Sequence, residues 1–223
     1  MSAIDLRGFS AKFASDDDPW STFTARDEAV KRDAILHALG PGPWGRVLEL
    51  ASGNGSNSVA LAAGALRLDA TEGTAEGTAL TAKALAGCPR ARASVLALPG
   101  RAPRPVYDAV VCAELLYYLS ARDMAAVARD VAAVLRPGGR LVLAHHRVDY
   151  YDFAQHAAGI HGRFLRATGR RWRVRGVRCT GKWRVVVAIE SSKKKKTLTS
   201  HRYAAGPSSP ASGRGAEIAA ALF

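Results

Sequence analysis

One segment in the first third of the chain carries the residues best suited to binding a ligand. The apolar run over 47–50 is typical of a buried parallel strand, and an apolar helical run follows over 59–63. Gly53 and Gly55 lie between the two runs, where glycine permits a sharp turn and a close approach of the backbone to a ligand. Free N–H groups at the start of the helix favour an anion, and Glu49 at the strand end could hold a hydroxyl or ammonium group. The segment therefore predicts a site for a nucleoside-type cofactor.

Further acidic residues follow other predicted strands. Glu72 lies 23 residues beyond Glu49, where doubly wound folds place an acid that accepts hydrogen bonds from both ribose hydroxyls. Asp69 is a weaker candidate for the ribose, and a helix cap is the structural alternative for Glu72. Glu114 ends the buried strand over 108–113. Because open α/β sheets bind ligands at the carboxyl ends of their strands, we expect these acids at one edge.

Alternating strands and helices must position these residues. The sequence predicts helices over 57–64, 74–86 and 121–135, and strands over 46–50, 66–71, 93–96, 108–113 and 140–144. Two late strands, over 172–179 and 183–189, form a hairpin that turns at Gly181. The expected fold is a single doubly wound, mostly parallel, seven-stranded α/β sheet with an antiparallel edge hairpin.

The two ends of the chain differ in character from its middle. Residues 1–23 are polar and irregular and are predicted to form an N-terminal cap segment, which precedes the domain over 24–190. The domain opens with a helix over 24–39, with Thr24 as N-cap and an apolar face of Ala29, Ile35, Leu36 and Leu39. Residues 191–223 are basic and of low complexity, which predicts a disordered tail.

Composition narrows the class of protein. The 223 residues are 48% hydrophobic without a run long enough to span a membrane, and the N-terminus lacks a signal pattern, so we expect a cytoplasmic protein. The three cysteines, Cys88, Cys112 and Cys179, have no metal-ligand spacing; no metal is predicted, and Cys112 is expected in the core. The net charge of +13 would suit nucleic acid, but six basic residues lie in the tail, which favours ordinary surface charge.

The motifs together resemble those of class I S-adenosylmethionine-dependent methyltransferases, whose fold is Rossmann-like. The resemblance covers roughly 45–145 and includes the glycine loop, Glu72, the strand that ends at Glu114 and the Arg-Pro-Gly-Gly turn over 136–139. Asp18-Pro19-Trp20, the segment over 113–119, and Ala144-His145-His146-Arg147 with the later Ile160-His161 resemble the NodS-like branch, typified by the N-methyltransferase of nodulation lipo-chitooligosaccharides. With these flanks, the resemblance extends over about 16–190.

The resemblance implies S-adenosylmethionine as cofactor and a role for each matching residue. Gly53 and Gly55 lie against its methionine and ribose, Glu49 anchors its amino group, and Glu72 holds the ribose diol. The remaining implied cofactor contacts are Trp20, Ala51, Leu98, Glu114 and Leu115.

Two positions depart from the family pattern. Ala51 replaces a glycine, which the turn accepts if the φ angle of Ala51 stays negative. Ala97 replaces an acid that precedes Leu-Pro, so adenine depends on backbone and apolar contacts such as Leu98.

Histidines near the same edge are candidates for proton transfer. A neutral amine must attack the methyl group and then loses a proton, a task that suits a histidine. His145 and His146 follow the fifth strand, and since neighbouring strand residues point to opposite faces, one of them should face the pocket. His161, on the helix that follows, is the other candidate, and Tyr117 and Tyr118 could line the acceptor site.

Several functions stay open on this evidence. The leading hypothesis is a small-molecule methyltransferase, with N-methylation of an amino sugar or oligosaccharide as one form. The basic charge motivates an RNA methyltransferase, which is disfavoured because no Asn/Asp-Pro-Pro-aromatic motif follows the fourth strand. Ala51 and Ala97 motivate a non-catalytic cofactor-binding or scaffold protein. A nicotinamide-dependent dehydrogenase is less favoured because the glycine spacing is not Gly-x-Gly-x-x-Gly.

Overall fold

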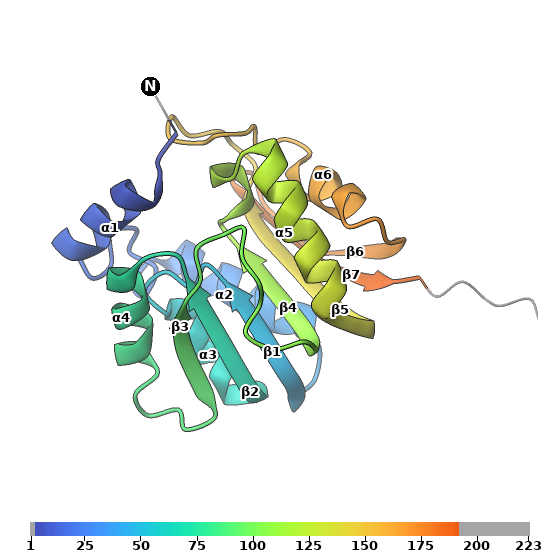
Figure 1. Ribbon diagram of the computed structural model, residues 1–223, viewed down its shortest axis with the longest axis horizontal. Coiled ribbons are helices and arrows are strands. Elements are labelled where there is room, and N and C mark those ends of the chain that lie inside the picture. The colour runs from blue at the N-terminus through green and yellow to red at the C-terminus, as the bar shows by residue number, and fades with distance from the viewer. Residues whose placement is uncertain (1–2, 192–223) are drawn as a thin grey trace, which may run out of the picture. The chain divides into compact units, whose positions relative to one another are not determined.

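Seven strands form one sheet in the order β3-β2-β1-β4-β5-β7-β6 (Figure 1). The computed structural model describes residues 3–191, so the predicted tail beyond residue 191 lies outside the described part. The strands are β1 (Trp44–Leu50), β2 (Ala65–Glu72), β3 (Ala91–Val95), β4 (Tyr107–Ala113), β5 (Leu135–His146), β6 (Trp172–Cys179) and β7 (Trp183–Glu190). The helices are α1 (Leu6–Ser15), α2 (Arg26–Leu39), α3 (Ser56–Gly64), α4 (Ala75–Ala84), α5 (Ala121–Val134) and α6 (Ile160–Ala167), with a short 3₁₀ turn η1 (Leu116–Tyr118).

The strand pairing confirms the predicted fold class. Strands β3, β2, β1, β4 and β5 run parallel, and β7 pairs antiparallel with both β5 and β6. The late hairpin therefore closes the sheet at one edge, with β7 inside and β6 outside. The predicted boundaries of these strands are correct within about two residues, except in β5.

Helices cover the two faces of the sheet unequally. Apolar residues of α2 and α3 pack against one face of β1, β2, β4, β5 and β7. Residues of α5 and α6 pack against the other face of β4, β5 and β7 and reach β1 through Leu48 and Leu50. In Figure 1, α5 lies in front of the sheet and α2 and α3 lie behind it. Among residues 3–191, no helix packs on the α5 side of β2 and β3.

Strand β5 follows helix α5 directly and contains the Pro-Gly-Gly segment near its start. Ser120 caps α5 by accepting a hydrogen bond from the Asp123 N–H, and the buried face carries Met124 and Val127. The helix ends at Val134 because proline and two glycines follow. The strand begins at once rather than at the predicted residue 140, and its pairing with β4 is interrupted by a bulge.

The N-terminal region is more ordered than the sequence predicted. Helix α1 forms within the supposedly irregular cap segment, and the Asp5 carboxylate caps it by accepting a hydrogen bond from the Gly8 N–H. Its Phe13 side chain is buried. Thr24 is not the cap of α2: that helix begins after Ala25, which makes no side-chain cap.

The buried face of α2 also differs from the prediction. Ala29 is exposed, whereas Ile35 and Leu39 are buried as expected. Lys31 is buried too, with only 2% of its surface exposed. The apolar periodicity alone could not show this, because a charged side chain is buried only when partners elsewhere in the chain neutralise it.

Cys112 is fully buried in β4 and confirms the predicted core position. The three cysteines are free thiols. Within residues 3–191, no group of three or more potential ligands could hold a metal ion. None of the helices in that range is both long and apolar enough to cross a membrane.

Substitution of Ile35 tests how α2 is held on the sheet. Ile35 is completely buried in the core cluster beneath α2. We expect Ile35→Ala to lower the free energy of unfolding by about 2–5 kcal/mol, because it removes apolar contacts and leaves a cavity. Chemical denaturation measures this effect. His37→Ala, at an exposed position of the same helix, should change stability by no more than about 0.5 kcal/mol; an equal loss would contradict the packing described here.

Candidate functional site

The carboxyl ends of β1, β2 and β4 lie side by side at one edge of the sheet. Leu50 at the end of β1 is in register with Thr71 of β2 and Cys112 of β4. The loop after β1 bonds to β2 through the Ser52 N–H and the Thr71 carbonyl, 2.9 Å apart. The segment after β4 bonds likewise to β5 through Glu114 and Ala144. The predicted acids and the glycine loop therefore share one edge.

The loop after β1 contains three residues with positive φ angles. These are Ala51 at 54°, Gly53 at 60° and Gly55 at 87°. The expectation from the sequence of a negative φ angle at Ala51 is wrong. Alanine occupies a left-handed conformation that glycine adopts at lower cost. A Cβ atom at Gly55 would lie 3.0 Å from the Cα atom of Thr81, so glycine also lets the loop approach α4 closely.

Glu72 is buried at the end of β2 and supports this loop. Its carboxylate accepts hydrogen bonds from the Gly53 N–H at 3.0 Å and the Thr74 N–H at 3.2 Å. Burial raises the pKa of Glu72, although these N–H donors oppose the shift. Asp69, the weaker candidate, lies farther back on β2 and accepts a hydrogen bond from the Tyr107 hydroxyl instead.

Glu49 lies deeper, beneath the start of α3. It is 2% exposed and accepts a hydrogen bond of 2.5 Å from the Ser58 hydroxyl. Burial raises the pKa of Glu49 to about 8, and the positive charge of Arg32 opposes this shift in part. The Arg32 Nε–H is itself buried without a hydrogen-bond partner among the described residues. The electrostatic effect of Arg32 on Glu49 places a cation with an unused donor close to the buried acid.

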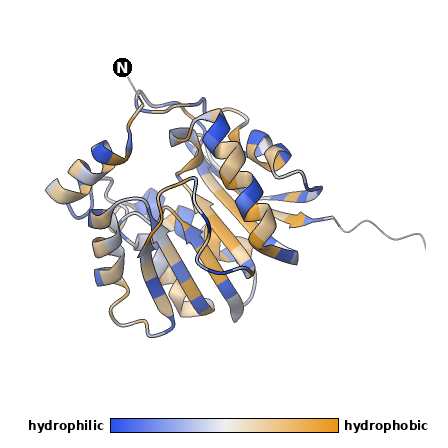
Figure 2. Cartoon of the chain, in the orientation of Figure 1, coloured by the Kyte–Doolittle hydropathy of each residue, from blue (hydrophilic) through white to orange (hydrophobic). Residues whose placement is uncertain are grey.

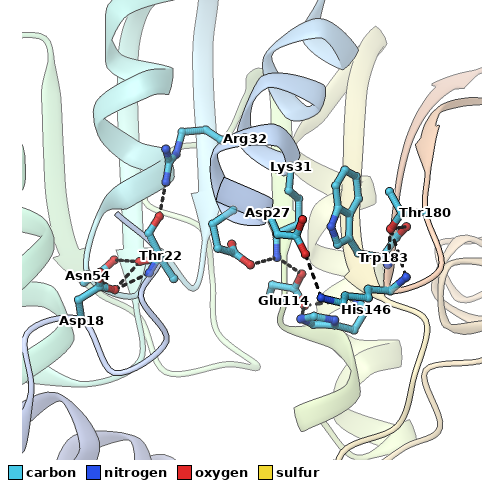
Figure 3. A network of polar contacts seen from close by, with 12 residues as sticks. Asp18, Thr22, Asp27, Lys31, Arg32, Asn54, Glu114, His146, Thr180 and Trp183 are labelled. Atoms are coloured by element: carbon cyan, nitrogen blue, oxygen red, sulfur yellow. Dashed lines mark hydrogen bonds and ion pairs between the residues drawn. The ribbon is translucent and has the colours of Figure 1, made fainter. Parts of the chain in front are cut away.

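Glu114 is the centre of a second polar network (Figure 3). Its carboxylate lies 2.6 Å from the Lys31 ammonium group, which also contacts Glu28 at 2.7 Å. Burial alone would lower the pKa of Lys31, but the carboxylates of Glu114 and Glu28 outweigh burial and raise it. The other Glu114 oxygen accepts from the Tyr117 hydroxyl and, at 3.3 Å, from the His146 N–H. Glu114 holds this position with a φ angle of 50°.

His145 has both ring nitrogens in hydrogen bonds. Nε2 accepts from the N–H groups of Leu115 at 3.3 Å and Leu116 at 3.1 Å, and Nδ1 lies 3.1 Å from Nε2 of His161. With Nε2 accepting, Nδ1 carries the proton and donates to His161. Burial lowers the pKa of His145 well below its ordinary 6.5, and burial also lowers that of His161, to about 4. Both rings are therefore neutral near pH 7 and engaged in fixing the turn after β4.

His146 points to the other side of β5, as the strand alternation predicted. Its side chain is 22% exposed and its Nε2 lies 3.8 Å from the Glu114 carboxylate. Its Nδ1 is buried and has no partner among residues 3–191. The ring packs edge-on against Tyr150, with centroids 5.2 Å apart. His145 thus has both ring nitrogens engaged and His161 has Nε2 engaged, whereas the His146 ring makes no hydrogen bond within the described chain.

A row of aromatic side chains borders this edge. Tyr117 is buried and stacks on Phe153 with ring centroids 3.7 Å apart. Tyr118 packs edge-on against Phe9 of α1, and Trp20 contacts the rings of Phe9 and Phe13. Trp20 is 39% exposed, so it lies at the rim.

Apolar residues line the α5 side of the edge. Leu98 and Leu96, in the segment after β3, form a shallow hollow with Leu48, Leu50 and residues of α5. Leu115 is buried in the same core cluster. The structure thus gives Leu98 and Leu115 apolar surroundings on the side of the edge opposite α2.

Three contributors to the edge were missed by the sequence analysis: Lys31, Arg32 and Phe13. Phe13 lies 3.8 Å from where a Cβ atom of Gly53 would be, so α1 reaches over the glycine loop. In the sequence, Lys31 and Arg32 stand a few residues after Asp27 and Glu28, on a helix that also carries an apolar face. A basic residue among apolar ones could have indicated a buried charge. Their partners lie far away in sequence, Glu114 being 83 residues from Lys31.

Residues 48–141 match the family model described as "Methyltransferase domain". This match spans the glycine loop, Glu72, Glu114 and the Pro-Gly-Gly segment, and it supports a transferase of methyl groups. The comparison with curated protein sequences finds no match.

Solved structures share the fold at low identity. N-methyltransferase NodS from Bradyrhizobium japonicum WM9, in complex with S-adenosylhomocysteine, is 16% identical with a TM-score of 0.68, covering 84% of this chain and 98% of that one. A DhpI–S-adenosylhomocysteine complex is 20% identical with a TM-score of 0.66, covering 84% and 96%. Phosphoethanolamine N-methyltransferase 1 from Haemonchus contortus is 17% identical with a TM-score of 0.61, covering 84% and 50%. At these identities the likeness shows a Rossmann-like methyltransferase fold.

Replacement of Glu49 by glutamine tests the cost of its burial. The pKa of Glu49 is about 8 in the folded protein and 4.5 in the unfolded chain, so the folded state favours the protonated carboxyl. The stability that Glu49 contributes is therefore fully present below about pH 4.5 and is lost as the pH rises through about 8. Glutamine does not ionise, so we expect Glu49→Gln to become progressively more stable than the wild type across this window. Unfolding curves at several pH values measure the difference.

An acid outside the core provides the control for this prediction. The pKa of Glu76 is lowered, chiefly by a hydrogen bond from the Ser10 hydroxyl. The Glu76→Gln variant should therefore follow the wild-type pH dependence between pH 5 and 8. The prediction is contradicted if the free energies of unfolding of Glu49→Gln and the wild type change with pH in the same way. Ionisation of Glu49 would then not destabilise the folded protein.

Proposed function

We propose that this chain is an S-adenosylmethionine-dependent methyltransferase that acts on the amino group of a small molecule. The observation that carries the proposal is the convergence of Glu49, Glu72 and Glu114 with the glycine loop at one sheet edge. These residues lie within the segment that matches the methyltransferase domain. Two relatives in fold, NodS and DhpI, have been solved with S-adenosylhomocysteine bound.

The residues at the edge fit the chemical groups of this cofactor. Its methionine end carries an ammonium and a carboxylate, for which Glu49 and the unused Arg32 Nε–H are suitable partners. Glu72 would accept hydrogen bonds from the ribose diol. Among the described residues, a Cβ atom at Gly53 would contact only Phe13 within 4 Å, so the loop presents bare backbone to a ligand.

Other contacts extend this assignment. Leu98 and Leu115 supply apolar surroundings suited to adenine, and Ala51 is the small residue that begins the loop. Trp20 at the rim would cover the bound cofactor together with α1. The cofactor supplies an electrophilic methyl group on a sulfonium, and the chain's task is to position and desolvate the reactants.

His146 is the residue that we assign to proton transfer. Its ring, which is 22% exposed and makes no hydrogen bond among residues 3–191, can accept the proton that an amine loses on methylation. Glu114, 3.8 Å away, would stabilise the positive charge that the ring then carries. His145 and His161 instead act as positioning residues, because their mutual hydrogen bond and the N–H groups of Leu115 and Leu116 engage them.

Aromatic side chains surround the position that we assign to the acceptor amine. Tyr117, Tyr118 and Tyr150 border His146 and Glu114, and such rings attract a cationic or apolar group. NodS and the Haemonchus enzyme are described as N-methyltransferases, which supports nitrogen as the methylated atom. We extend the proposal to the NodS-like branch, with an amino sugar or oligosaccharide amine as the first acceptor to test.

Calorimetric titration with S-adenosylhomocysteine tests the cofactor site. We expect micromolar binding, no binding of NADH, and a loss of about tenfold or more in affinity for Glu72→Gln, because a charged acceptor for the ribose hydroxyls is removed. Glu76→Gln, four residues along, should bind like the wild type, because the Glu76 carboxylate contacts Ser10 of α1 and not the glycine loop. Failure of the wild type to bind S-adenosylhomocysteine would overturn the proposal.

Replacement of His146 tests the catalytic assignment. We expect His146→Asn to lower the turnover of an amine acceptor by about 10²–10⁴-fold while the affinity for S-adenosylhomocysteine stays within about twofold. His156→Asn, at an exposed position in the segment after β5, should retain full turnover. Wild-type turnover in His146→Asn would remove this residue from the mechanism. Cofactor binding without turnover of any amine would instead favour the non-catalytic hypothesis.

A further inference from the structure

The face of β2 and β3 that lacks a helix is polar rather than apolar, and Arg46 of the neighbouring β1 continues it. In Figure 1 this face is turned to the viewer, and the segment between β3 and β4 crosses in front of it. Figure 2 shows hydrophilic bands across the same strands. A sheet face that is apolar must be covered by another element. This face can stay uncovered because its side chains are polar.

Four arginines lie on or beside this face. Strand alternation places Arg46 of β1 on the same face as Leu48, and Arg67 of β2 on the same face as Asp69. Arg46 and Arg67 are register partners on adjacent strands, as are Asp69 and Arg92. Like charges directly opposite each other on neighbouring strands are destabilising unless something between them neutralises the charge.

The acid on this face does not balance these charges. Asp69 is 6% exposed and is engaged by the Tyr107 hydroxyl at 3.0 Å and by Arg46 at 3.5 Å. Among residues 3–191, no carboxylate lies within ion-pair distance of Arg67, Arg92 or Arg104. Three guanidinium groups therefore remain without an acidic partner in the described chain.

Two of these arginines line a hollow of about 270 Å³. Its walls are Asp69, Arg92 and Ser94 from the sheet, and Pro103 and Arg104 from the segment between β3 and β4. The two guanidinium forks and the Ser94 hydroxyl supply hydrogen-bond donors from both sides. Guanidinium groups recognise phosphate and carboxylate oxygens through paired N–H donors.

We propose that this hollow binds a small ligand that carries two or more phosphate groups. Its volume suits a compact polyanion, and Arg67 and Arg46 extend the positive charge along the sheet. Tyr107, the aromatic residue in contact with Asp69, is buried, so it gives nucleotide bases no surface on which to stack. The hollow therefore favours a small polyphosphate over a single-stranded nucleic acid.

The site is separate from the cofactor edge. Asp69 precedes Glu72 by three residues on β2, which corresponds to about 10 Å along a strand. Leu96 and Leu98, which precede the segment over the hollow, line the apolar hollow against α5 instead. Occupation of the two sites should therefore be independent.

Titration of the full chain with pyrophosphate tests this inference. We expect saturable binding that Arg92→Ala/Arg104→Ala weakens by about tenfold or more, because two charged donors are removed. Arg122→Ala/Arg129→Ala, which removes two exposed arginines from α5, should bind within about twofold of the wild type. Saturating S-adenosylhomocysteine should leave pyrophosphate affinity unchanged.

Three results would overturn the proposal. The first is no saturable binding of pyrophosphate by the wild type. The second is an equal loss in both double variants, which would indicate diffuse surface charge. The third is tighter binding of a single-stranded RNA that pyrophosphate cannot displace. None of these results bears on the cofactor site, which the S-adenosylhomocysteine titration tests separately.

Discussion

The burial of the Lys31 ammonium group between two carboxylates is the constraint on which the rest of the candidate site depends. Removing a charge from water costs several kcal/mol, so Lys31 requires both Glu28 and Glu114 as partners. Glu28 lies on the same helix, whereas Glu114 follows β4. The ion pair therefore fixes α2 against the end of a strand in the middle of the sheet, and it fixes Glu114 in an orientation that also reaches Tyr117 and His146.

Backbone strain is concentrated at the same edge. Among residues 3–191, three non-glycine residues have positive φ angles, and two of them, Ala51 and Glu114, directly follow β1 and β4. Such conformations cost about 1–3 kcal/mol each and persist where surrounding contacts enforce them. Hydrogen bonds across the edge provide that enforcement: Ser52 bonds to β2, and Glu114 bonds to β5. Two adjacent strand ends held in strained geometry are typical of a site that must present its groups in one fixed arrangement.

The sequence predicted the sheet and its carboxyl edge because both depend on local patterns. Apolar runs mark the strands, and Gly53 and Gly55 mark the turn, so the register of Leu50 with Thr71 and Cys112 follows once the topology is known. What could not be predicted depends on distant partners. The burial of Lys31 requires Glu114, and the difference between His145 and His146 requires the positions of Leu115, Leu116 and His161. Helix α1 was missed because few of its residues are buried.

The protonation state of the acids at the edge indicates that a ligand with a positive charge would bind there. Burial raises the pKa of both Glu49 and Glu72, which means that the folded protein disfavours the ionised form of each carboxyl group. Lys31 compensates Glu114, but within residues 3–191 no comparable ion pair compensates Glu49, which Arg32 stabilises only in part. A ligand that carries an ammonium group beside Glu49 would remove this penalty and favour the ionised carboxylate. Cofactor binding and deprotonation of Glu49 should therefore be coupled, and affinity should rise with pH as the carboxylate ionises.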